Sequence, residues 1–244
     1  MVLNERQKKI IELVKAAKHI SVKKLASELY VSEMTVRRDL KLLETSGYIH
    51  RYNGGATSAH EYDELPLESR LHFNTKEKKQ LCENAAKYLH DGITVFIDSS
   101  STCEYIIPLL AEYRDVRLIT NSIKCLLEAA RQGIPCVIIG GGYYENDMCT
   151  IGGDAVDFIS RYNIDVAFLT SRGVDEAGNV SDSNDAQTAV RRAVIRRSRE
   201  TVLLFDSSKL GKRYIYSLIN SKELTQNIHI YIIGCNLKAC SDEI

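Results

Sequence analysis

The chain has 244 residues, 44% of them hydrophobic, and it carries 32 basic and 32 acidic residues. This length allows one large domain or two modest ones, and the apolar content is enough for a sizeable core. No apolar run approaches the ~20 residues that cross a bilayer, and the first ten residues hold no apolar signal segment, so we expect a cytoplasmic protein with no membrane contact.

The cysteines and histidines form no recognisable metal or redox motif. Seven cysteines are scattered along the chain without a Cys-x-x-Cys pair, and the six histidines include no His-Glu-x-x-His motif. We therefore predict buried, reduced thiols, no metal site and no cofactor.

Charge is unevenly distributed along the chain. Residues 1–57 hold eleven Lys and Arg against six Asp and Glu, a net charge of +5, whereas the remaining 187 residues hold 21 basic and 26 acidic residues, a net charge of −5. A small basic segment on an acidic body predicts that the segment meets a polyanion.

The basic segment begins with a predicted helix over residues 4–19. Asn4 caps it, and Gln7 three residues later completes the pattern of a capping box. Its expected apolar face holds Ile10, Val14 and Ala17, with Leu13 beside them.

A second, short helix is predicted over residues 21–29, with Ser21 as its cap. A tight turn at residues 30–31 then leads to a third helix, which Ser32 caps. On a helical wheel the third helix turns Val36, Leu40 and Leu43 toward the core.

The opposite side of the third helix is basic, and its first turn carries a hydroxyl and a thioether. Such a ridge suits a helix that lies in the major groove of DNA, where arginine grips guanine or a phosphate. The candidate DNA-binding residues on this helix are Ser32, Met34, Thr35, Arg37, Arg38 and Lys41.

Residues 47–55, "GYIHRYNGG", alternate in polarity and end in a turn, which predicts a two-stranded wing. His50 and Arg51 would lie near the DNA backbone or the minor groove. The alternative is a solvated, charged helix face on a small bundle. The ordered succession of short helix, tight turn, capped helix and wing favours DNA binding.

The run "VSEMTVRRDLKLLETSGYIHRYNGGA" at residues 31–56 resembles the winged helix-turn-helix signature of the DeoR-type bacterial repressors. Tyr30 occupies a turn position where related sequences often carry a small residue. A left-handed backbone at Tyr30 would cost ~1–2 kcal/mol.

Residues 58–75 lack clear periodicity and contain Pro66, so we interpret them as a linker between a DNA-binding domain at 1–57 and a second domain at 76–244. The second domain alternates apolar runs with helical patterns, which predicts βαβ units, a mainly parallel sheet and an α/β fold class. The six predicted strands are "ITVFI", "VRLIT", "CVIIG", "DVAFLT", "TVLLF" and "IHIYII".

Small, hydroxyl or basic residues follow several of these strands, where open α/β sheets bind ligands. The run Asp98 to Thr102 opens onto a helix and is a natural phosphate cradle. Each loop alone is more simply a helix cap or turn, but together they favour an anionic small-molecule site. The other candidates at strand ends are Asn121, Gly141, Gly142, Arg172, Asp175 and Lys209.

The resemblance to the DeoR-type family continues through "DSSST", "IGGG", "DVAFLTSRGVD" and "FDSSKLGK". It implies a sensor domain similar in fold to ribose-5-phosphate isomerases and the CoA-transferase-like group, with a phosphorylated sugar or related metabolite as effector. The phosphate would lie near Ser99, Ser101 and Thr102, with Lys209 close by. Asp98, Asp175 and Arg191 would line the sugar end. Ser100 stands where the family usually has Gly, and Gln187 stands near a position where an acidic residue is common.

We expect a transcriptional repressor of sugar or related carbon metabolism that binds a double-stranded operator as a dimer or tetramer, because one small head buries too little surface alone. The alternative is a sugar-phosphate isomerase with a DNA-binding head, for which Asp175, Glu176 and Asp182 are candidate carboxylates. A third option is a regulator that senses protein contacts and no small ligand.

Overall fold

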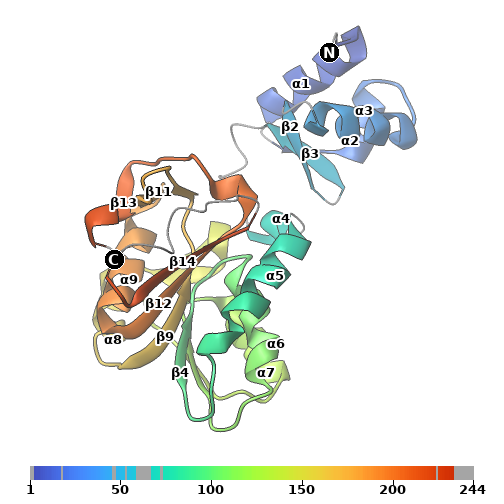
Figure 1. The fold of residues 1–244 in the computed structure, drawn as a ribbon. Coiled ribbons are helices and arrows are strands. Elements are labelled where there is room, and N and C mark those ends of the chain that lie inside the picture. Colours follow the sequence, from blue (N-terminus) through green and yellow to red (C-terminus); the bar gives the residue numbers. More distant parts are fainter. Residues whose placement is uncertain are drawn as a thin grey trace. The chain divides into compact units, whose positions relative to one another are not determined.

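This computed structural model describes residues 3–17, 19–45, 48–52, 54–58, 67–71, 74–223 and 225–233. The chain divides into two units, Met1–Phe73 and Asn74–Ile244, whose elements are labelled in Figure 1. Most of the predicted linker at 58–75 lies outside the described residues, apart from a short helix, α4 (Leu67–Arg70).

Apart from α4, the described part of the first unit contains three helices and a small sheet. Its elements are α1 (Glu5–Ala17), β1 (His19–Ser21), α2 (Val22–Glu28), α3 (Glu33–Thr45), β2 (Ile49–Tyr52) and β3 (Gly55–Ser58). The capping box is confirmed, because the Gln7 amide donates to Asn4 Oδ1 at 2.9 Å and the Asn4 amide donates to Gln7 Oε1 at 3.2 Å. The predicted first helix was too long, since α1 ends at Ala17, which is exposed, and His19 already belongs to a strand.

The hydrophobic core of the first unit lies between the helices and the sheet. Ser21 and Ser32 cap α2 and α3 as predicted, each accepting a backbone N–H three residues on. The predicted inner faces are confirmed except at Ala17, which is exposed, and they form a cluster of buried side chains: Ile10, Val14, Ile20, Val22, Leu25, Val36, Leu40, Leu43, Ile49 and Ala56.

The predicted wing has a third strand. Strands β2 and β3 pair antiparallel, with Tyr52 opposite Gly55, and β1 pairs antiparallel with the other edge of β3, with Ile20 opposite Ala56. Three residues are too few for a periodicity signal. The first residue of β1, His19, was therefore assigned to the first predicted helix, and its last residue, Ser21, to the second. The extra strand ties the wing to the connection between α1 and α2.

A buried ion pair joins α1 to α3. Arg6 Nε lies 2.5 Å from Asp39 Oδ2, and Gln7 Nε2 donates to Asp39 Oδ1 at 3.3 Å. The Asp39 side chain is only 2% exposed, whereas that of Arg6 is 33% exposed. The hydrogen bond to Asp39 raises the pKa of Arg6 above its usual value. Asp39 therefore turns inward while its neighbour Arg38 turns outward.

The second unit is built on a six-stranded sheet, and its elements follow in chain order. The helices are α5 (Thr75–Ala85), α6 (Ile107–Leu110), α7 (Ile123–Arg131), α8 (Gly153–Ile159) and α9 (Asp185–Arg197). The strands of the main sheet are β4 (Thr94–Ile97), β5 (Arg117–Thr120), β6 (Cys136–Ile138), β9 (Ile164–Leu169), β12 (Ser198–Phe205) and β14 (Ile228–Ile232).

All six strands predicted from apolar runs are confirmed, and every pairing in the main sheet is parallel. Two smaller antiparallel groups were not predicted: β7 (Gly142–Tyr144) with β8 (Cys149–Ile151), and β10 (Gly173–Val174) with β11 (Val180–Asp182) and β13 (Tyr216–Ile219). The short 3-10 turns are Ala86–Tyr88, Cys103–Ile106, Glu145–Asp147, Ser207–Lys209 and Ser221–Glu223.

Helices cover both faces of the main sheet (Figure 1). One core packs α5, α6 and α7 against alternate side chains of the strands, such as Val95 and Ile97 of β4. The other packs α8 and α9 against the opposite side chains, such as Phe96. A strand buried on both faces has no polar alternation, which explains the continuous apolar runs in the sequence.

The strand order is β14-β12-β9-β4-β5-β6. From β4 the chain moves outward through β5 to β6 and then returns to β9 on the other side of β4. The order therefore reverses between β4 and β9, and the loops after these two strands diverge there. In open α/β sheets this switch point is where ligands bind.

We predict that the Arg6–Asp39 pair contributes more to the stability of the first unit than its exposed ion pairs do. Arg6→Ala leaves a buried carboxylate whose remaining partner among the described side chains is Gln7, and it should lower the free energy of opening by ~3 kcal/mol. Hydrogen exchange of the α1 and α3 amides in the full chain measures this. As a control, Lys8→Ala removes only the exposed pair with Glu5 and should leave exchange unchanged.

Candidate functional site

The basic ridge of α3 and the wing form one face of the first unit. Six of the eight candidate DNA-binding residues line a single hollow of about 410 Å³: Met34, Thr35, Arg37, Arg38, Lys41 and Arg51. The side chains of Arg38 and Lys41 are exposed, and no ion pair is found for either among the described residues. These two cations are therefore available to an external polyanion.

The other candidates on this face are held by neighbours. Ser32 Oγ lies 3.0 Å from Thr35 Oγ1, so both hydroxyls sit at the start of α3. Arg37 pairs with Glu33 one turn back at 3.2 Å. Arg51 Nε lies 2.7 Å from Glu44 Oε2, and the Arg51 amide donates to the same carboxylate. His50 is half-buried on β2.

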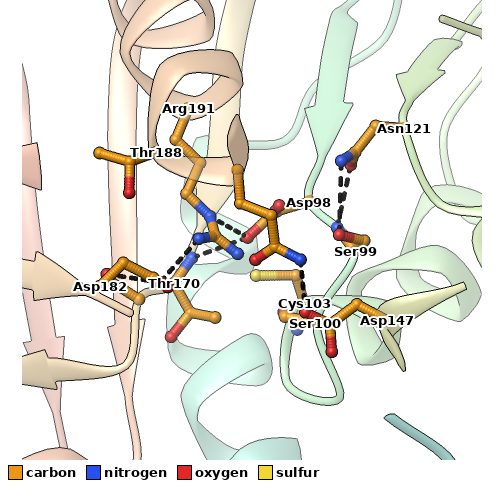
Figure 2. A network of polar contacts seen from close by, with 12 residues as sticks. Asp98, Ser99, Ser100, Cys103, Asn121, Asp147, Thr170, Asp182, Thr188 and Arg191 are labelled. Atoms are coloured by element: carbon orange, nitrogen blue, oxygen red, sulfur yellow. Dashed lines mark hydrogen bonds and ion pairs between the residues drawn. The ribbon is translucent and has the colours of Figure 1, made fainter. Parts of the chain in front are cut away.

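In the second unit, a buried arginine joins the loop after β4 to the small sheet. Arg191 of α9 places Nε 2.9 Å from Asp98 Oδ2 and Nη1 2.8 Å from Asp182 Oδ2, and Figure 2 shows it between the two carboxylates. Burial works to lower the pKa of Arg191, but the attraction of Asp98 and Asp182 outweighs it and raises that pKa. The Thr170 amide, after β9, also points to Asp98 Oδ2 at 3.5 Å.

The loop after β4 is ordered by its neighbours. The Ser99 amide donates to Asn121 Oδ1 at 3.1 Å, and Asn121 Nδ2 lies 3.4 Å from Ser99 Oγ, a contact visible in Figure 2. Ser100 Oγ accepts the Cys103 amide at 2.9 Å, so the residue at the usual glycine position caps the following turn. Two strand-end loops are thereby joined in one polar cluster.

A buried lysine that the sequence analysis did not single out contacts this loop. Lys78 of α5 is 1% exposed, and its Nζ donates to Ser101 Oγ at 3.0 Å. The first turn of α5 is fixed beside the loop after β12, because Asn74 Nδ2 donates to Asp206 Oδ1 at 3.0 Å and Glu77 Oε2 accepts the Ser207 amide. Lys78 therefore lies where the resemblance placed the phosphate.

Lys209 belongs to the same region. It is buried in the turn after β12. Burial works to raise the pKa of Asp206, but the attraction of Lys209, the Ser208 hydroxyl and Lys78 outweighs it, so this pKa is lowered. Two buried lysines on separate elements are thus close enough to act on one carboxylate.

A second buried polar group lies next to Arg191. Gln187, one turn earlier on α9 and 2% exposed, donates through Nε2 to Asp147 Oδ2. Arg172 Nη2 lies 3.4 Å from the same carboxylate. Gln187 Oε1 is buried and accepts no hydrogen bond from any described residue. An unsatisfied buried carbonyl is unfavourable, and a ligand donor placed there would satisfy it.

Three candidate residues are not brought into these clusters. The Asp175 carboxylate is occupied within its own turn, where Oδ1 accepts the amides of Ala177 and Asn179. Gly141 has a φ of +134°, and a Cβ there would lie 2.6 Å from the Ile151 carbonyl, so close backbone packing accounts for this glycine. Gly142 begins β7 and is exposed.

Cysteine side chains lie beneath the loop after β4. Cys82, Cys103 and Cys125 are buried, and Cys82 Sγ donates to the Thr102 carbonyl at 3.2 Å. Burial raises the pKa of Cys125 to about 12 and also raises those of Cys82 and Cys103. The five described cysteines form no disulfide with one another, and burial is as predicted for all of them except Cys136, which is half-buried. Cys235 and Cys240 lie outside the described residues.

Sequence patterns offered little sign of four polar residues in these clusters: Lys78, Asp147, Asp182 and Gln187. Lys78 lies in a lysine-rich helix, whose sequence predicts a solvent-exposed face. Asp182 is a candidate in the sequence only as a carboxylate of the isomerase alternative. Asp147 lies in a short turn. The available signal was the departure at Gln187, an amide near a position where an acidic residue is common.

Both units match family models. Residues 6–62 match the DeoR-like helix-turn-helix domain, and residues 73–230 match the DeoR C terminal sensor domain.

Relatives match most of the chain, across both units. One is the uncharacterized HTH-type transcriptional regulator YulB of Bacillus subtilis, 33% identical over 93% of this chain and 89% of the relative. Another is the glycerol-3-phosphate regulon repressor of Haemophilus influenzae, 30% identical over 87% of this chain and 84% of the relative.

Solved structures similar to the chain include ribose 5-phosphate isomerase A of Methanocaldococcus jannaschii. It is 21% identical and has a TM-score of 0.42, over 56% of this chain and 55% of that one. The translation initiation factor eIF-2B of Pyrococcus horikoshii OT3 is 16% identical and has a TM-score of 0.47, over 85% and 81%. Among the described residues, no helix combines the length and apolarity that a bilayer span requires.

We predict that Asp206 makes the second unit acid-sensitive. Its folded pKa lies below the unfolded value of about 3.9, so its stabilisation is complete above that pH and is lost as pH falls through the folded pKa. Asp206→Asn should lower stability at pH 7 by ~2 kcal/mol and flatten the acid dependence. Urea unfolding of the full chain between pH 2.5 and 7 measures both effects. A parallel loss of stability in both proteins below pH 4 would contradict this role.

Proposed function

Because this chain belongs to the DeoR family of transcriptional regulators, we propose that it represses genes of sugar or related carbon metabolism by binding operator DNA. The effector that controls it is a phosphorylated sugar or polyol, held at the switch point of the parallel sheet. The observation that carries the DNA-binding half is the gathering of α3 and wing residues around one hollow, with Arg38 and Lys41 exposed.

The shape and charge of this face support insertion of α3 into the major groove. Its buried side anchors the helix through Val36, Leu40 and Leu43, so the opposite side is presented on a rigid support. Arg38 and Lys41 reach base edges or phosphates there, while Arg51 extends from the wing toward the backbone. The Glu44 carboxylate fixes the direction of Arg51 beforehand.

The phosphate of the effector is expected beside Ser99, Ser101 and Thr102. Lys78 and Lys209 support this placement, because a dianionic phosphate offsets the burial of two ammonium groups. Ser101 Oγ already accepts a hydrogen bond from Lys78 Nζ. A phosphate oxygen could therefore bind to both groups with little rearrangement of side chains.

The hydroxyl end of the effector is expected beside Asp98, Arg191 and Gln187. Gln187 Oε1 is an acceptor with no donor among the described residues, and three carboxylates lie around two arginines in this cluster. Such a set accepts hydrogen bonds from hydroxyl groups and repels a ligand carboxylate. The name of the Haemophilus relative includes glycerol 3-phosphate, which has both a phosphate and hydroxyl groups.

The active assembly is proposed to be a dimer or tetramer, because one small head gives too little interface for operator affinity and symmetry doubles it. The effector acts by differential affinity for two arrangements of the assembly. A coupling of this kind changes DNA affinity by about 5- to 150-fold.

The isomerase alternative gains no support from two of its candidate carboxylates, Asp175 and Asp182. Asp175 is held inside its own turn, and Asp182 is engaged by Arg191, by Ser171 at 3.0 Å and by two backbone amides. A general base needs a free oxygen near the substrate proton. Measurable interconversion of pentose or hexose phosphates that Asp182→Asn abolishes would restore the enzyme.

We predict that Arg38→Ala weakens DNA binding about 5- to 150-fold without unfolding the first unit, because its side chain is exposed and reaches a base edge or phosphate. The duplex is one selected by the wild-type protein from random sequences, and gel-shift titration at fixed salt gives Kd. Lys9→Ala, an exposed cation of α1 paired with Glu12, is the control and should keep wild-type Kd.

We predict that Lys209→Ala and Lys78→Met each weaken effector binding at least tenfold while DNA affinity without effector stays unchanged, since a charge-assisted hydrogen bond is lost. Thermal shift with glycerol 3-phosphate, ribose 5-phosphate and fructose 6-phosphate identifies the ligand, because 100 times its Kd adds ~2.7 kcal/mol. Lys79→Met alters an exposed neighbour on the same helix and serves as the control. Equal melting shifts in all four proteins would remove both lysines from the site.

A further inference from the structure

The turn between α2 and α3 contains a backbone outlier. Tyr30 has a φ of 52°, in the left-handed region that bulky side chains rarely adopt. The hydrogen bonds around it define a Schellman motif, because the Tyr30 amide donates to the Ser27 carbonyl and the Val31 amide donates to the Ala26 carbonyl. Tyr30 occupies the position of this motif that favours glycine.

Among the described residues of the first unit, no contact offsets this strain. The Tyr30 side chain is 95% exposed, the highest value among the exposed large hydrophobic residues, and no described residue hydrogen-bonds to its hydroxyl. Glycine would end α2 through the same two backbone bonds without the steric penalty. We therefore infer that the Tyr30 side chain contacts a partner molecule. Strained backbone that the fold itself does not require is often kept because it serves a function.

The location of Tyr30 beside the first turn of α3 indicates the kind of partner. Tyr30 lies two positions before Ser32, the cap of α3, and four before Met34, which lines the cationic hollow and is 76% exposed. A side chain that leaves the chain here stands at the entrance of the helix that carries Arg38 and Lys41. Tyrosine is neutral, and its rigid, amphipathic ring and hydroxyl suit a sugar and a phosphate oxygen.

We propose that Tyr30 is a DNA-backbone contact, in which the hydroxyl donates to a phosphate oxygen beside the groove that α3 enters. This inference rests on the proposed DNA-binding function. The contact fixes the depth and angle of α3 and carries no sequence information, because phosphates are the same at every base pair. In the complex, this contact would offset the backbone strain at Tyr30.

Two variants of the full chain separate strain from contact. Tyr30→Gly should slow hydrogen exchange of the α2 amides, since the turn is relieved, and should raise Kd for DNA about tenfold. Tyr30→Phe should leave exchange unchanged and raise Kd about fivefold, since only the hydroxyl is lost. Tyr143→Phe, an exposed tyrosine of the second unit, is the control and should change neither readout.

Kd is measured at fixed salt on the duplex selected by the wild-type protein and on an unrelated duplex. The proposal expects both affinities to fall by the same factor, so that the ratio between them is kept. Wild-type affinity in Tyr30→Gly or in Tyr30→Phe overturns it, as does a loss confined to the selected duplex, which would indicate base contact. Selection of no duplex by the wild-type protein would instead refute the DNA-binding function, and this inference with it.

Discussion

The buried Arg191 holds together the part of the second unit that is proposed to bind the effector. It comes from α9, and it reaches Asp98 after β4 and Asp182 on β11, with 5% of its side chain exposed. Removing one member of such a buried pair typically costs about 3–5 kcal/mol, because the remaining charge is left without its partner. The reversal of strand order between β4 and β9 brings these elements to one point. A helix, a main strand and a small sheet therefore keep a fixed geometry around the switch point.

Much of the fold was predictable because its signals are local. Capping residues such as Asn4 and Ser32 stand in fixed positions relative to the helices they begin, and continuous apolar runs mark strands buried on both faces. The short strands β1 and β10 lie outside any apolar run, carry no periodicity and were missed. The strand order was not predictable either, since it depends on which hydrophobic faces meet and not on spacing along the chain.

The candidate site divides in the same way. Residues at strand ends, such as Asp98, Ser99 and Asn121, were found because parallel strands place their carboxyl ends on one edge. Lys78 and Gln187 were missed as ligand candidates because a buried polar residue on an amphipathic helix looks like a solvated one in sequence. Asp175 lies outside these clusters, since a carboxylate in a turn has a local use that a motif does not reveal.

The thiols beneath the loop after β4 have an experimental consequence. Cys82 donates to the Thr102 carbonyl, and the raised pKa values of Cys82, Cys103 and Cys125 keep these groups as unreactive thiols in the closed structure. An alkylating reagent reaches them only when the loop detaches from α5. The rate of alkylation would therefore measure how often the region proposed to hold the phosphate opens. The alkylation rate would report occupancy by a metabolite through side chains that the protein already carries, without an attached fluorophore.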